Sequence, residues 1–347
     1  MDETGAHRRR TGRSWLGFAA WSLLVVIYAV VVFSWLWHYD MRPRGGWYDQ
    51  LAYRTFLVRV LGVHVGLVGL AVIGIAALMK RWRYALASLP VVVFLLWPIH
   101  GGWIGSGDTL PSAADGELTI LSVNLRRGVE TDHDGVLRQI SRVDPDILVL
   151  QEYTERWNDV LGPALDRQFV HRFASVRTDP QGIATFTNLD VDNERSVQLG
   201  RWEYPALRST LRLDDGSALD LYNVHLAMPL SSSAAGHVEQ RRQVARLSEL
   251  IRHSSRATIV MGDLNVTETT QHFDVLLDAG LHSAWDDLHG GRGVTWKRLG
   301  RVEGLAPGLR LDHLLGTTDI RFSGIARGSR GSSDHWPLVA TFSISHR

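Results

Sequence analysis

The chain has 347 residues, 45% of them hydrophobic and 21% charged, and this composition excludes a disordered or collagen-like protein. The net charge of +1 hides two different parts. Residues 1–107 carry 11 Lys and Arg against 4 Asp and Glu, a net charge of +7, whereas residues 108–347 carry 26 against 32, a net charge of −6. Cysteine is absent, which excludes disulfides, thiolate metal sites and cysteine nucleophiles.

The first part has the features of a membrane domain. Eight of the 13 tryptophans lie at or before Trp103, and tryptophan is enriched at membrane interfaces. The 23 residues from Trp15 to Trp37 carry no charge, and a helix of this length covers the hydrocarbon layer of about 30 Å. With two further uncharged runs, the sequence predicts three transmembrane helices, near 15–37, 58–79 and 84–104. The last run contains Pro90 and Pro98, so a re-entrant or interfacial segment is the alternative there.

Basic clusters set the expected orientation of these helices. The cluster HRRR (7–10) precedes the first run, and KRWR (80–83) separates the second run from the third. Such clusters stay in the cytoplasm, so three crossings would carry the rest of the chain outside, and the conclusion reverses if the third run does not cross. A cleaved signal peptide is the rival for the first run, but the run is too long and no small-x-small cleavage site follows it. The sequence therefore predicts a multi-pass protein of the cell membrane with a basic cytoplasmic tail (1–14), a membrane domain (15–107), a flexible tether (108–116) and an extracytoplasmic catalytic domain (117–347).

The second part alternates short apolar runs with polar helical stretches. Runs rich in Val, Ile, Leu and Thr, typical of strands, lie at 117–126, 146–152, 182–188, 218–227, 257–265, 310–316 and 336–344. Amphipathic patterns predict helices at 132–143, 154–167 and 236–253. This mixture predicts a layered α/β domain.

Polar side chains gather at the ends of the predicted strands. They are Asn124, Glu152, His225, Asp263, Asn265, Asp312, Asp334 and His335. Each alone is explained by a turn, a helix cap or a buried histidine. Together they supply the oxygen ligands that a hard divalent cation prefers and the groups that activate water.

The motifs that contain these residues resemble those of a known superfamily. QE (151–152), NVHL (223–226), GDLN (262–265), RLDH (310–313) and SDHWP (333–337) occur in the order found in the endonuclease/exonuclease/phosphatase superfamily, which includes DNase I. The resemblance implies a four-layer α/β sandwich and hydrolysis of a phosphate ester or anhydride. It covers residues 117–347 only. Three membrane spans before such a domain are similar to the bacterial membrane-anchored branch that includes VanJ-type teicoplanin-resistance proteins.

The resemblance assigns a metal site to part of the set. It makes Glu152 the main Mg²⁺ ligand, with Asn124 assisting at the metal-bound phosphate and Asp334 binding directly or through water; Mn²⁺ is the alternative metal. A carboxylate suits this position because Mg²⁺ keeps several waters and takes only one or two protein oxygens.

The resemblance assigns the acid–base chemistry to the remaining residues. Asp263 and Asn265 would orient the attacking water and the phosphate, and His225 would donate to a nonbridging oxygen. His335 would act as general base or as a donor to the transition state, with Asp312 fixing its tautomer. The residue that takes the proton, Asp263 or His335, stays open. Many superfamily members have Tyr or Phe where this chain has His313, a minor departure.

Three polar residues outside the motifs have either a functional or a structural interpretation. Arg208 is at even odds a phosphate clamp or a solvated strand residue, since a guanidinium matches phosphate bidentately. Gln240 and Arg241, near the start of a predicted helix, are expected on the surface.

The charge of the second part bears on the substrate. A nuclease normally carries a basic surface, and residues 108–347 are acidic, so no nucleic-acid partner is expected. A domain held near lipid headgroups favours a phosphatase of a lipid phosphate or pyrophosphate, such as a polyprenyl carrier of the cell envelope. The alternatives are a phosphodiesterase, either nuclease or phospholipase-like, and a non-catalytic membrane-anchored scaffold.

Overall fold

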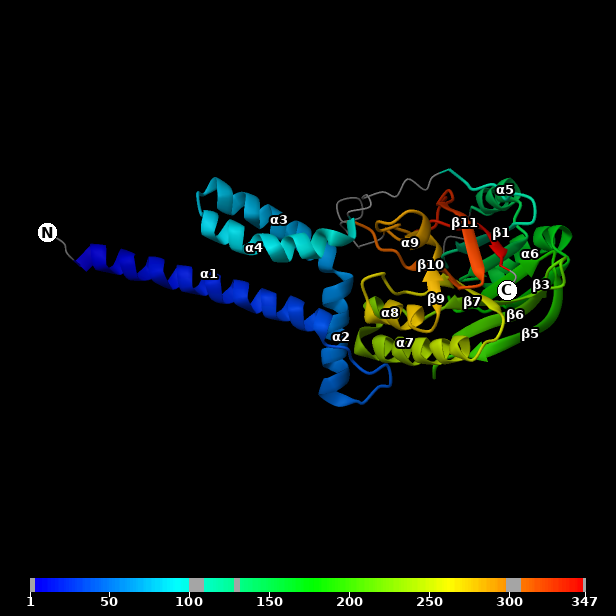
Figure 1. Ribbon diagram of the computed structural model, residues 1–347, viewed down its shortest axis with the longest axis horizontal. Helices are drawn as coiled ribbons and strands as arrows, with labels where there is room; N and C mark the ends of the chain where they lie inside the picture. The colour runs from blue at the N-terminus through cyan, green and yellow to red at the C-terminus, as the bar shows by residue number, and fades with distance from the viewer. Residues whose placement is uncertain (1–3, 100–108, 128–131, 298–306, 346–347) are drawn as a thin grey trace. The chain divides into compact units, whose positions relative to one another are not determined.

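The computed structural model describes residues 4–99, 109–127, 132–297 and 307–345 (Figure 1). The chain divides into two compact units, Met1–Tyr39 with Arg54–Pro98, and Asp40–Tyr53 with Ile99–Arg347. The helices are α1 (Thr4–Leu36), α2 (Gly46–Val60), α3 (Gly62–Leu78), α4 (Trp82–Leu96), α5 (His133–Val143), α6 (Glu155–Gln168), α7 (Pro229–Arg252), α8 (Gln271–Leu277) and α9 (Ala284–Leu288). The strands are β1 (Leu118–Asn124), β2 (Ile147–Gln151), β3 (His171–Ser175), β4 (Ile183–Thr187), β5 (Asp190–Gln198), β6 (Pro205–Arg212), β7 (Ala218–His225), β8 (Ala257–Asp263), β9 (Leu281–Ser283), β10 (Asp312–Thr317), β11 (Ile320–Arg327) and β12 (Leu338–Ile344).

The first unit contains the helices that are apolar enough for a membrane. Gly17–Leu36 in α1 and Trp82–Ile99, which is α4 with a short 3-10 turn, are each long enough to cross. A third crossing results if α2 and α3, bent by 60° at the break between them, count as one span. The helices α1 and α4 lie at the first and third predicted spans, of which residues 100–104 lie outside the described residues. Helix α3 and the end of α2 lie at the second predicted span, but α2 begins earlier, at Gly46.

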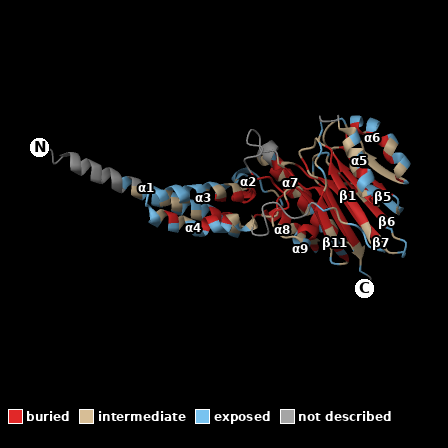
Figure 2. Cartoon of the chain, turned by 90° about the horizontal axis from the view of Figure 1, so that it is seen from above, coloured by how far each residue is buried: buried red, intermediate tan, exposed pale blue. Residues whose placement is uncertain are grey.

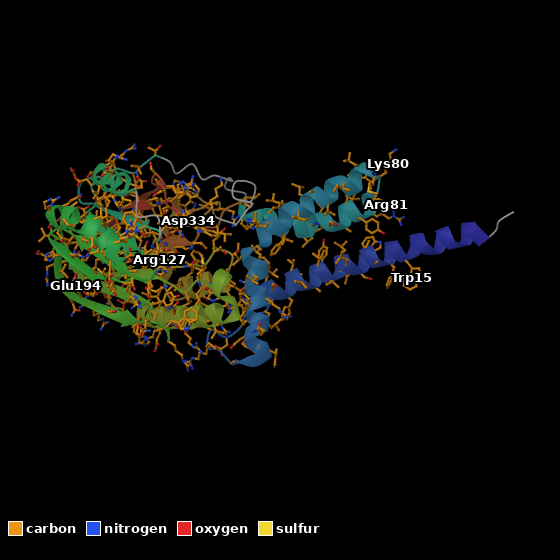
Figure 3. The ribbon with its side chains drawn as sticks, turned by 180° about the vertical axis from the view of Figure 1, so that it is seen from behind. Trp15, Lys80, Arg81, Arg127, Glu194 and Asp334 are labelled. Atoms are coloured by element: carbon orange, nitrogen blue, oxygen red, sulfur yellow. The ribbon has the colours of Figure 1, made fainter. Side chains whose placement is uncertain are left out.

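Helices α1 and α4 run side by side in the same direction. The Tyr84 hydroxyl at the start of α4 donates to the Gly17 carbonyl of α1 at 3.4 Å. Further along both helices, the Tyr28 hydroxyl donates to the Ala87 carbonyl at 2.7 Å. The end of α1 that carries Trp15 therefore lies beside the turn before α4, as the labelled residues of Figure 3 also show.

Helix α3 packs closely against α4 through small residues. A Cβ placed on Gly66 would lie 2.8 Å from the Leu96 side chain, and one on Gly69 would lie 2.6 Å from Val92. Small residues of this kind let helices approach closely inside a membrane, where apolar burial does not drive association. Since Gly66 faces Leu96 and Gly69 faces Val92, α3 and α4 run in opposite directions.

A buried arginine caps the C-terminal end of α1. Arg59 donates from Nε to the Ser34 carbonyl at 2.8 Å and from Nη2 to the Trp35 carbonyl at 2.9 Å. The last carbonyls of a helix have no partner within the helix and carry partial negative charge. The guanidinium therefore satisfies these carbonyls and neutralises the negative end of the helix dipole.

The second unit consists of two six-stranded sheets packed face to face. Their strand orders are β11-β12-β1-β2-β4-β3 and β5-β6-β7-β8-β10-β9. A core of Ile, Val, Leu and Phe side chains from both sheets fills the space between them. Helices α5 and α6 cover the outer face of the first sheet through a second core, and α7 and α8 lie beside the second sheet (Figure 1). Figure 2 shows the strands buried between helices whose outer faces are exposed. The layered α/β domain predicted from the sequence is confirmed, and its layers include two sheets.

The segment Asp40–Tyr53 belongs to this second unit, although the sequence places it in the membrane domain. It packs on α7, where the Arg241 guanidinium donates to Asp49 at 2.8 Å and to the Arg42 carbonyl at 3.1 Å. Arg241 and Gln240 are both fully buried. The expectation that these two residues lie on the surface was wrong, because the segments that cover them are not adjacent to α7 in the sequence.

The described part of the predicted tether is packed rather than free. Leu110 packs against the core beneath α5 and α6, and Pro111 lies so close to Gly324 that a Cβ there would be 2.5 Å away. The Ala114 amide donates to Glu117 at 2.9 Å. The catalytic domain therefore begins before residue 117, with residues 110–114 as part of its surface.

Candidate active site

Two pairs of parallel strands carry the predicted site residues to one edge of the domain. In the first sheet β1 and β2 are parallel, with Asn124 opposite Gln151, so Glu152 follows directly beside Asn124. In the second sheet β7 and β8 are parallel, with His225 opposite Asp263. Because carboxyl ends of parallel strands meet at the same edge, all four strands end in polar side chains there.

Strand β10 adds a further carboxylate to this edge. It runs antiparallel to β8, so its first residue, Asp312, lies opposite the last residue of β8, Asp263. The Thr295 hydroxyl accepts hydrogen bonds from the backbone amides of Leu311 and Asp312, both at 3.0 Å. These bonds fix the start of β10, so the Asp312 carboxylate is held rigidly.

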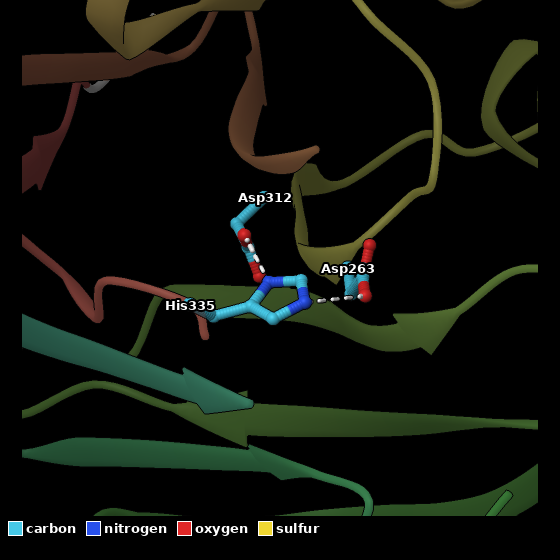
Figure 4. Close-up of side chains that lie close together, drawn as sticks. All are labelled: Asp263, Asp312 and His335. Carbon is cyan, nitrogen blue, oxygen red and sulfur yellow. Dashed lines mark hydrogen bonds and ion pairs between the residues drawn. The ribbon is translucent and has the colours of Figure 1, made fainter. Parts of the chain in front are cut away.

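The core of the site is a line of three buried side chains (Figure 4). His335 Nδ1 lies 2.7 Å from Asp312 Oδ2, and His335 Nε2 lies 3.8 Å from Asp263 Oδ2. All three side chains are at least 95% buried. Asp312 accepts the Nδ1 proton, which leaves Nε2 facing Asp263.

Asp263 is the hub of the site, since one of its oxygens faces three partners. Asn124 Nδ2 donates to Oδ2 at 3.0 Å, and His225 Nε2 lies 3.7 Å from the same oxygen. The other oxygen, Oδ1, accepts a hydrogen bond from the backbone N–H of Asn265 at 3.0 Å. The structure thus brings Asn124, His225, Asp263 and His335 into one cluster with Asp312.

The electrostatics of this cluster are strongly perturbed. Burial raises the pKa of Asp263 to about 6, with the Asp312 charge adding to the effect and His335 opposing it. Burial lowers the pKa of His335, but Asp312 and Asp263 outweigh it and raise the pKa to about 10. Two carboxylates on either side of one imidazole therefore favour the imidazolium form.

The GDLN motif contains two residues with positive φ, Gly262 and Asn265. Gly262 has φ of 134°, and a Cβ on it would lie 2.1 Å from the Val224 carbonyl oxygen. Asn265 has φ of 52°, and its side chain donates to the Leu226 carbonyl at 2.9 Å. Glycine and asparagine tolerate such conformations at the lowest cost. The Asn265 side chain therefore fixes the loop after Asp263 rather than pointing freely at a substrate.

Glu152 lies beside Asn124, directly after the end of β2. It is half-buried with φ of 55°, and its Oε2 accepts the Arg127 amide at 2.6 Å. Together with the adjacent Asn124 it offers the hard oxygen donors that Mg²⁺ prefers. Asp263, Asp312 and His335 form a second group, whose ligand atoms lie close enough together to hold a metal ion.

Asp334 is already engaged by two partners. Its Oδ1 lies 3.5 Å from Arg126 Nε, and its Oδ2 accepts from the Trp296 indole at 3.4 Å. Arg126 and Arg127 belong to the same turn after Asn124, so this turn connects Asp334 with Glu152; Figure 3 labels Arg127 and Asp334. Because both carboxylate oxygens already have partners, this geometry favours binding of the metal by Asp334 through water over direct binding.

Arg208 is not part of the cluster. It pairs with the fully buried Asp220 at 2.6 Å and lies over the Tyr222 ring. Tyr222 and Asp220 alternate with Asn223 and His225 along β7, so they point to the opposite face of the sheet. The Arg208 side chain is only 18% exposed, so it is not the solvated residue of the structural alternative, and its pairing with Asp220 gives no support to a phosphate clamp.

Sequence reasoning missed two amides beneath the site. Gln151 Nε2 donates to Asn223 Oδ1 at 3.0 Å and so joins the two sheets. Ser122 donates to Gln151 Oε1 at 3.2 Å, and Asn223 donates to the Ala184 carbonyl at 2.8 Å. Both residues stood inside the QE and NVHL motifs, and the signal was their polarity at positions where the strand pattern predicts burial.

Sequence reasoning also missed the residues that hold the site loops. Ser333 donates to the Asn124 carbonyl at 2.9 Å and accepts the His335 amide at 3.1 Å. Gln240 Nε2 donates to the carbonyls of Ala227, Leu264 and Asn265. Only the fold brings these partners together.

The fold and the site define a two-sheet hydrolase of phosphate esters. A sequence model of the endonuclease/exonuclease/phosphatase family matches residues 121–335, and the chain belongs to this family. Members of the family are phosphoester hydrolases that use divalent metal ions, and this chain is an enzyme of that class. No curated protein matches the sequence.

Solved structures of the family share the fold of the second unit. A 3' phosphatase NExo from Neisseria, bound to a product DNA hairpin, is 20% identical over 64% of this chain and 98% of its own, with a TM-score of 0.55. The catalytic domain of human Nocturnin with bound sulfate is 19% identical over 68% and 97%, with a TM-score of 0.55. Truncated Caenorhabditis elegans TDP2 is 20% identical over 66% and 98%, with a TM-score of 0.51.

Proposed function

We propose that this protein is a Mg²⁺-dependent phosphatase that acts outside the cytoplasmic membrane on a lipid phosphate or pyrophosphate. The observation that carries the proposal is the covalent union of apolar, membrane-length helices with an acidic catalytic unit in one chain. A polyprenyl phosphate of the cell envelope fits this description. A role in glycopeptide resistance, as in the VanJ-type proteins that the chain resembles, would follow from such a substrate.

The chain's own residues supply the acid–base part of the mechanism. Asp312 holds the imidazole of His335, so that Nε2 presents a proton to a phosphate oxygen in the transition state. Asp263, on the other side of the imidazole, accepts the proton of the attacking water, while His225 and Asn124 face the same Asp263 oxygen. Glu152 and Asn124 would hold the metal ion, which supplies Lewis-acid stabilisation of the phosphate charge.

Two contacts support an extracytoplasmic catalytic unit. Helices α1 and α4 run in the same direction and α3 runs in the opposite one, which suits three crossings with the Arg-rich tail and Lys80–Arg83 on the cytoplasmic side. The Asp49–Arg241 ion pair lies within the catalytic unit. The loop after α1 must therefore share a side of the membrane with that unit, which requires an even number of crossings between them.

Charge supports a lipid over a nucleic acid. Residues 108–347 have a net charge of −6, so a polyanion meets net repulsion, although a bound cation reverses the field within a Debye length of about 10 Å. The DNA hairpin in the NExo structure is a product of that enzyme and does not identify the substrate of this chain. A nuclease is the second candidate, and the test below separates the two.

The test is a substrate panel with the purified full-length protein in detergent. A lipid pyrophosphate, a lipid monophosphate, a phosphodiester lipid and supercoiled DNA are each offered with Mg²⁺, and both phosphate release and DNA nicking are recorded. Phosphate release from the lipids without nicking is expected. Efficient nicking at a comparable enzyme concentration would replace the proposal with the nuclease, and inertness on every substrate would favour the scaffold.

The metal dependence is tested in the same assay. EDTA or Glu152→Gln should reduce turnover by orders of magnitude, because loss of the principal carboxylate weakens both metal binding and its Lewis-acid effect. Glu155→Gln, an exposed neighbour at the start of α6, is the matched control and should stay active. Undiminished turnover in EDTA or in Glu152→Gln would contradict the proposed metal site.

A further inference from the structure

A cavity adjoins the active site on the outer side of the first sheet. It has a volume of about 400 Å³ and lies between α5, the end of β1 and the loop 328–333. Leu110, Val136 and Pro337 form part of its apolar wall. The catalytic mechanism uses none of these residues.

Two buried donors in the wall of this cavity have no acceptor. Trp157 is 1% exposed, and its indole N–H has no hydrogen-bond partner among the residues that the structure describes. The Gln139 amide nitrogen, also in the wall, likewise has none within the described ranges. A buried donor without a partner costs about 1–3 kcal/mol, so an acceptor bound in the cavity would be favoured.

The charges around the cavity have one predominant sign. Three arginines, Arg138, Arg142 and Arg330, are among the residues that line it. The one carboxylate in the lining, Asp132, accepts the Ser332 amide at 3.3 Å. Arginines with N–H donors and a net positive charge are the chemistry that recognises phosphate.

The cavity shares residues with the catalytic cluster. Asn124 lines it and donates to Asp263 at 3.0 Å. Ser333 lines it too and accepts the His335 amide at 3.1 Å. An occupant of the cavity would therefore lie one residue away from the groups that act on the scissile phosphate.

We propose that this cavity is a second anion site, which binds a phosphate group separate from the one that is hydrolysed. Arg138, Arg142 and Arg330 supply the charge, and Trp157 and Gln139 supply the buried donors. The group comes either from the distal phosphate of a pyrophosphate substrate or from the inorganic phosphate released by the reaction. Both sources rest on the proposed phosphatase function, and the first also requires a pyrophosphate substrate.

The binding test avoids turnover and the metal site. Titration calorimetry with inorganic phosphate is performed on full-length Glu152→Gln protein in detergent and EDTA. Arg138→Gln with Arg142→Gln, two exposed positions on α5, should weaken phosphate binding about tenfold or more, and Trp157→Phe should weaken it through loss of the N–H. Arg167→Gln, exposed on α6 and outside the cavity, is the matched control and should bind as before. Equal affinity in the pocket variants and the control, or no saturable binding at millimolar phosphate, would overturn the site.

The two sources are distinguished with the active enzyme. If the pocket holds the distal phosphate, the paired arginine variant raises KM for a lipid pyrophosphate and leaves KM for a lipid monophosphate unchanged. If it holds the product, the variant relieves inhibition by phosphate and changes neither KM. Because binding is measured without catalysis, a failure of the proposed function leaves the binding result intact.

Discussion

Asp263 Oδ2 faces Asn124, His225 and His335. No single position in the sequence predicts that these four residues lie together. Each of the four residues ends a different strand or loop, and each alone has an ordinary structural explanation. The pattern of polar residues at strand ends predicted that they would meet. The pairing of His335 with Asp312 came from the family resemblance, and the 2.7 Å contact is consistent with it.

The Asp312–His335 pair should act as a unit. Asp312→Asn is expected to lower kcat about a hundredfold or more, because loss of the Asp312 charge disfavours the imidazolium form of His335 that donates from Nε2, with Mg²⁺ affinity almost unchanged. The double variant with His335→Ala should be little worse than His335→Ala alone, because residues that act together are not additive. Steady-state kinetics with a metal titration measures both quantities, and fully additive losses would mean that the two residues act independently.

His313 gives the folded protein a defined pH response. Burial lowers the pKa of His313 to about 4, with Arg310 adding to the effect, from an ordinary value of 6.5. The unfolded chain therefore takes up a proton between pH 6.5 and pH 4 that the folded chain refuses, so this contribution to stability is complete above pH 6.5 and is lost as the pH falls.

The pH response can be isolated by substitution. His313→Phe keeps the ring contact with Phe273 and should flatten the loss of unfolding free energy between pH 6.5 and pH 4 by up to about 3 kcal/mol. Chemical unfolding of both proteins across this range, followed by fluorescence, provides the measurement. Parallel curves for the two proteins would show that His313 is not the group responsible.

At the scale of elements, seven of the described strands were predictable from apolar runs, and five others, β3, β5, β6, β9 and β11, were not. Every apolar run named from the sequence forms a strand in the structure. Strand β5, DVDNERSVQ, is exposed along almost its whole length, so it lacks the alternation that a half-buried strand shows. It forms because β6 offers a ladder of backbone partners from Asp190 with Arg212 to Gln198 with Pro205, with one irregularity between Val191 and Asn193.

Helix α7 depends on an ion pair that no local pattern indicates. Arg241→Met should lower the unfolding free energy by about 3 kcal/mol, because it leaves the Asp49 carboxylate buried without its charge partner. Adding Asp49→Asn should restore part of that loss. Arg246→Met, on the same helix, removes a pair between two side chains that are about half-exposed and serves as the matched control with little effect. Thermal unfolding in detergent that gives equal losses for Arg241→Met and Arg246→Met would contradict the role of the buried pair.

At the scale of the whole molecule, the absence of cysteine makes the membrane topology directly testable. Single cysteines at Gln50, Lys80 and Glu194, all exposed, provide one probe in each region. In intact cells a membrane-impermeant maleimide should label Gln50→Cys and Glu194→Cys, and should reach Lys80→Cys only after permeabilisation. Opposite labelling of Gln50→Cys and Glu194→Cys would mean that α4 does not cross.

The position of Asp40–Tyr53 has a practical consequence for anyone who expresses the enzyme. A gene fragment that starts at residue 109 encodes both sheets but omits the peptide that covers α7. In such a fragment Arg241 would lose Asp49 and the carbonyls of Asp40 and Arg42, and a buried guanidinium would face solvent. A soluble version of this enzyme therefore has to be assembled from two separate stretches of the gene, either by grafting residues 40–53 onto the fragment or by supplying them as a second peptide.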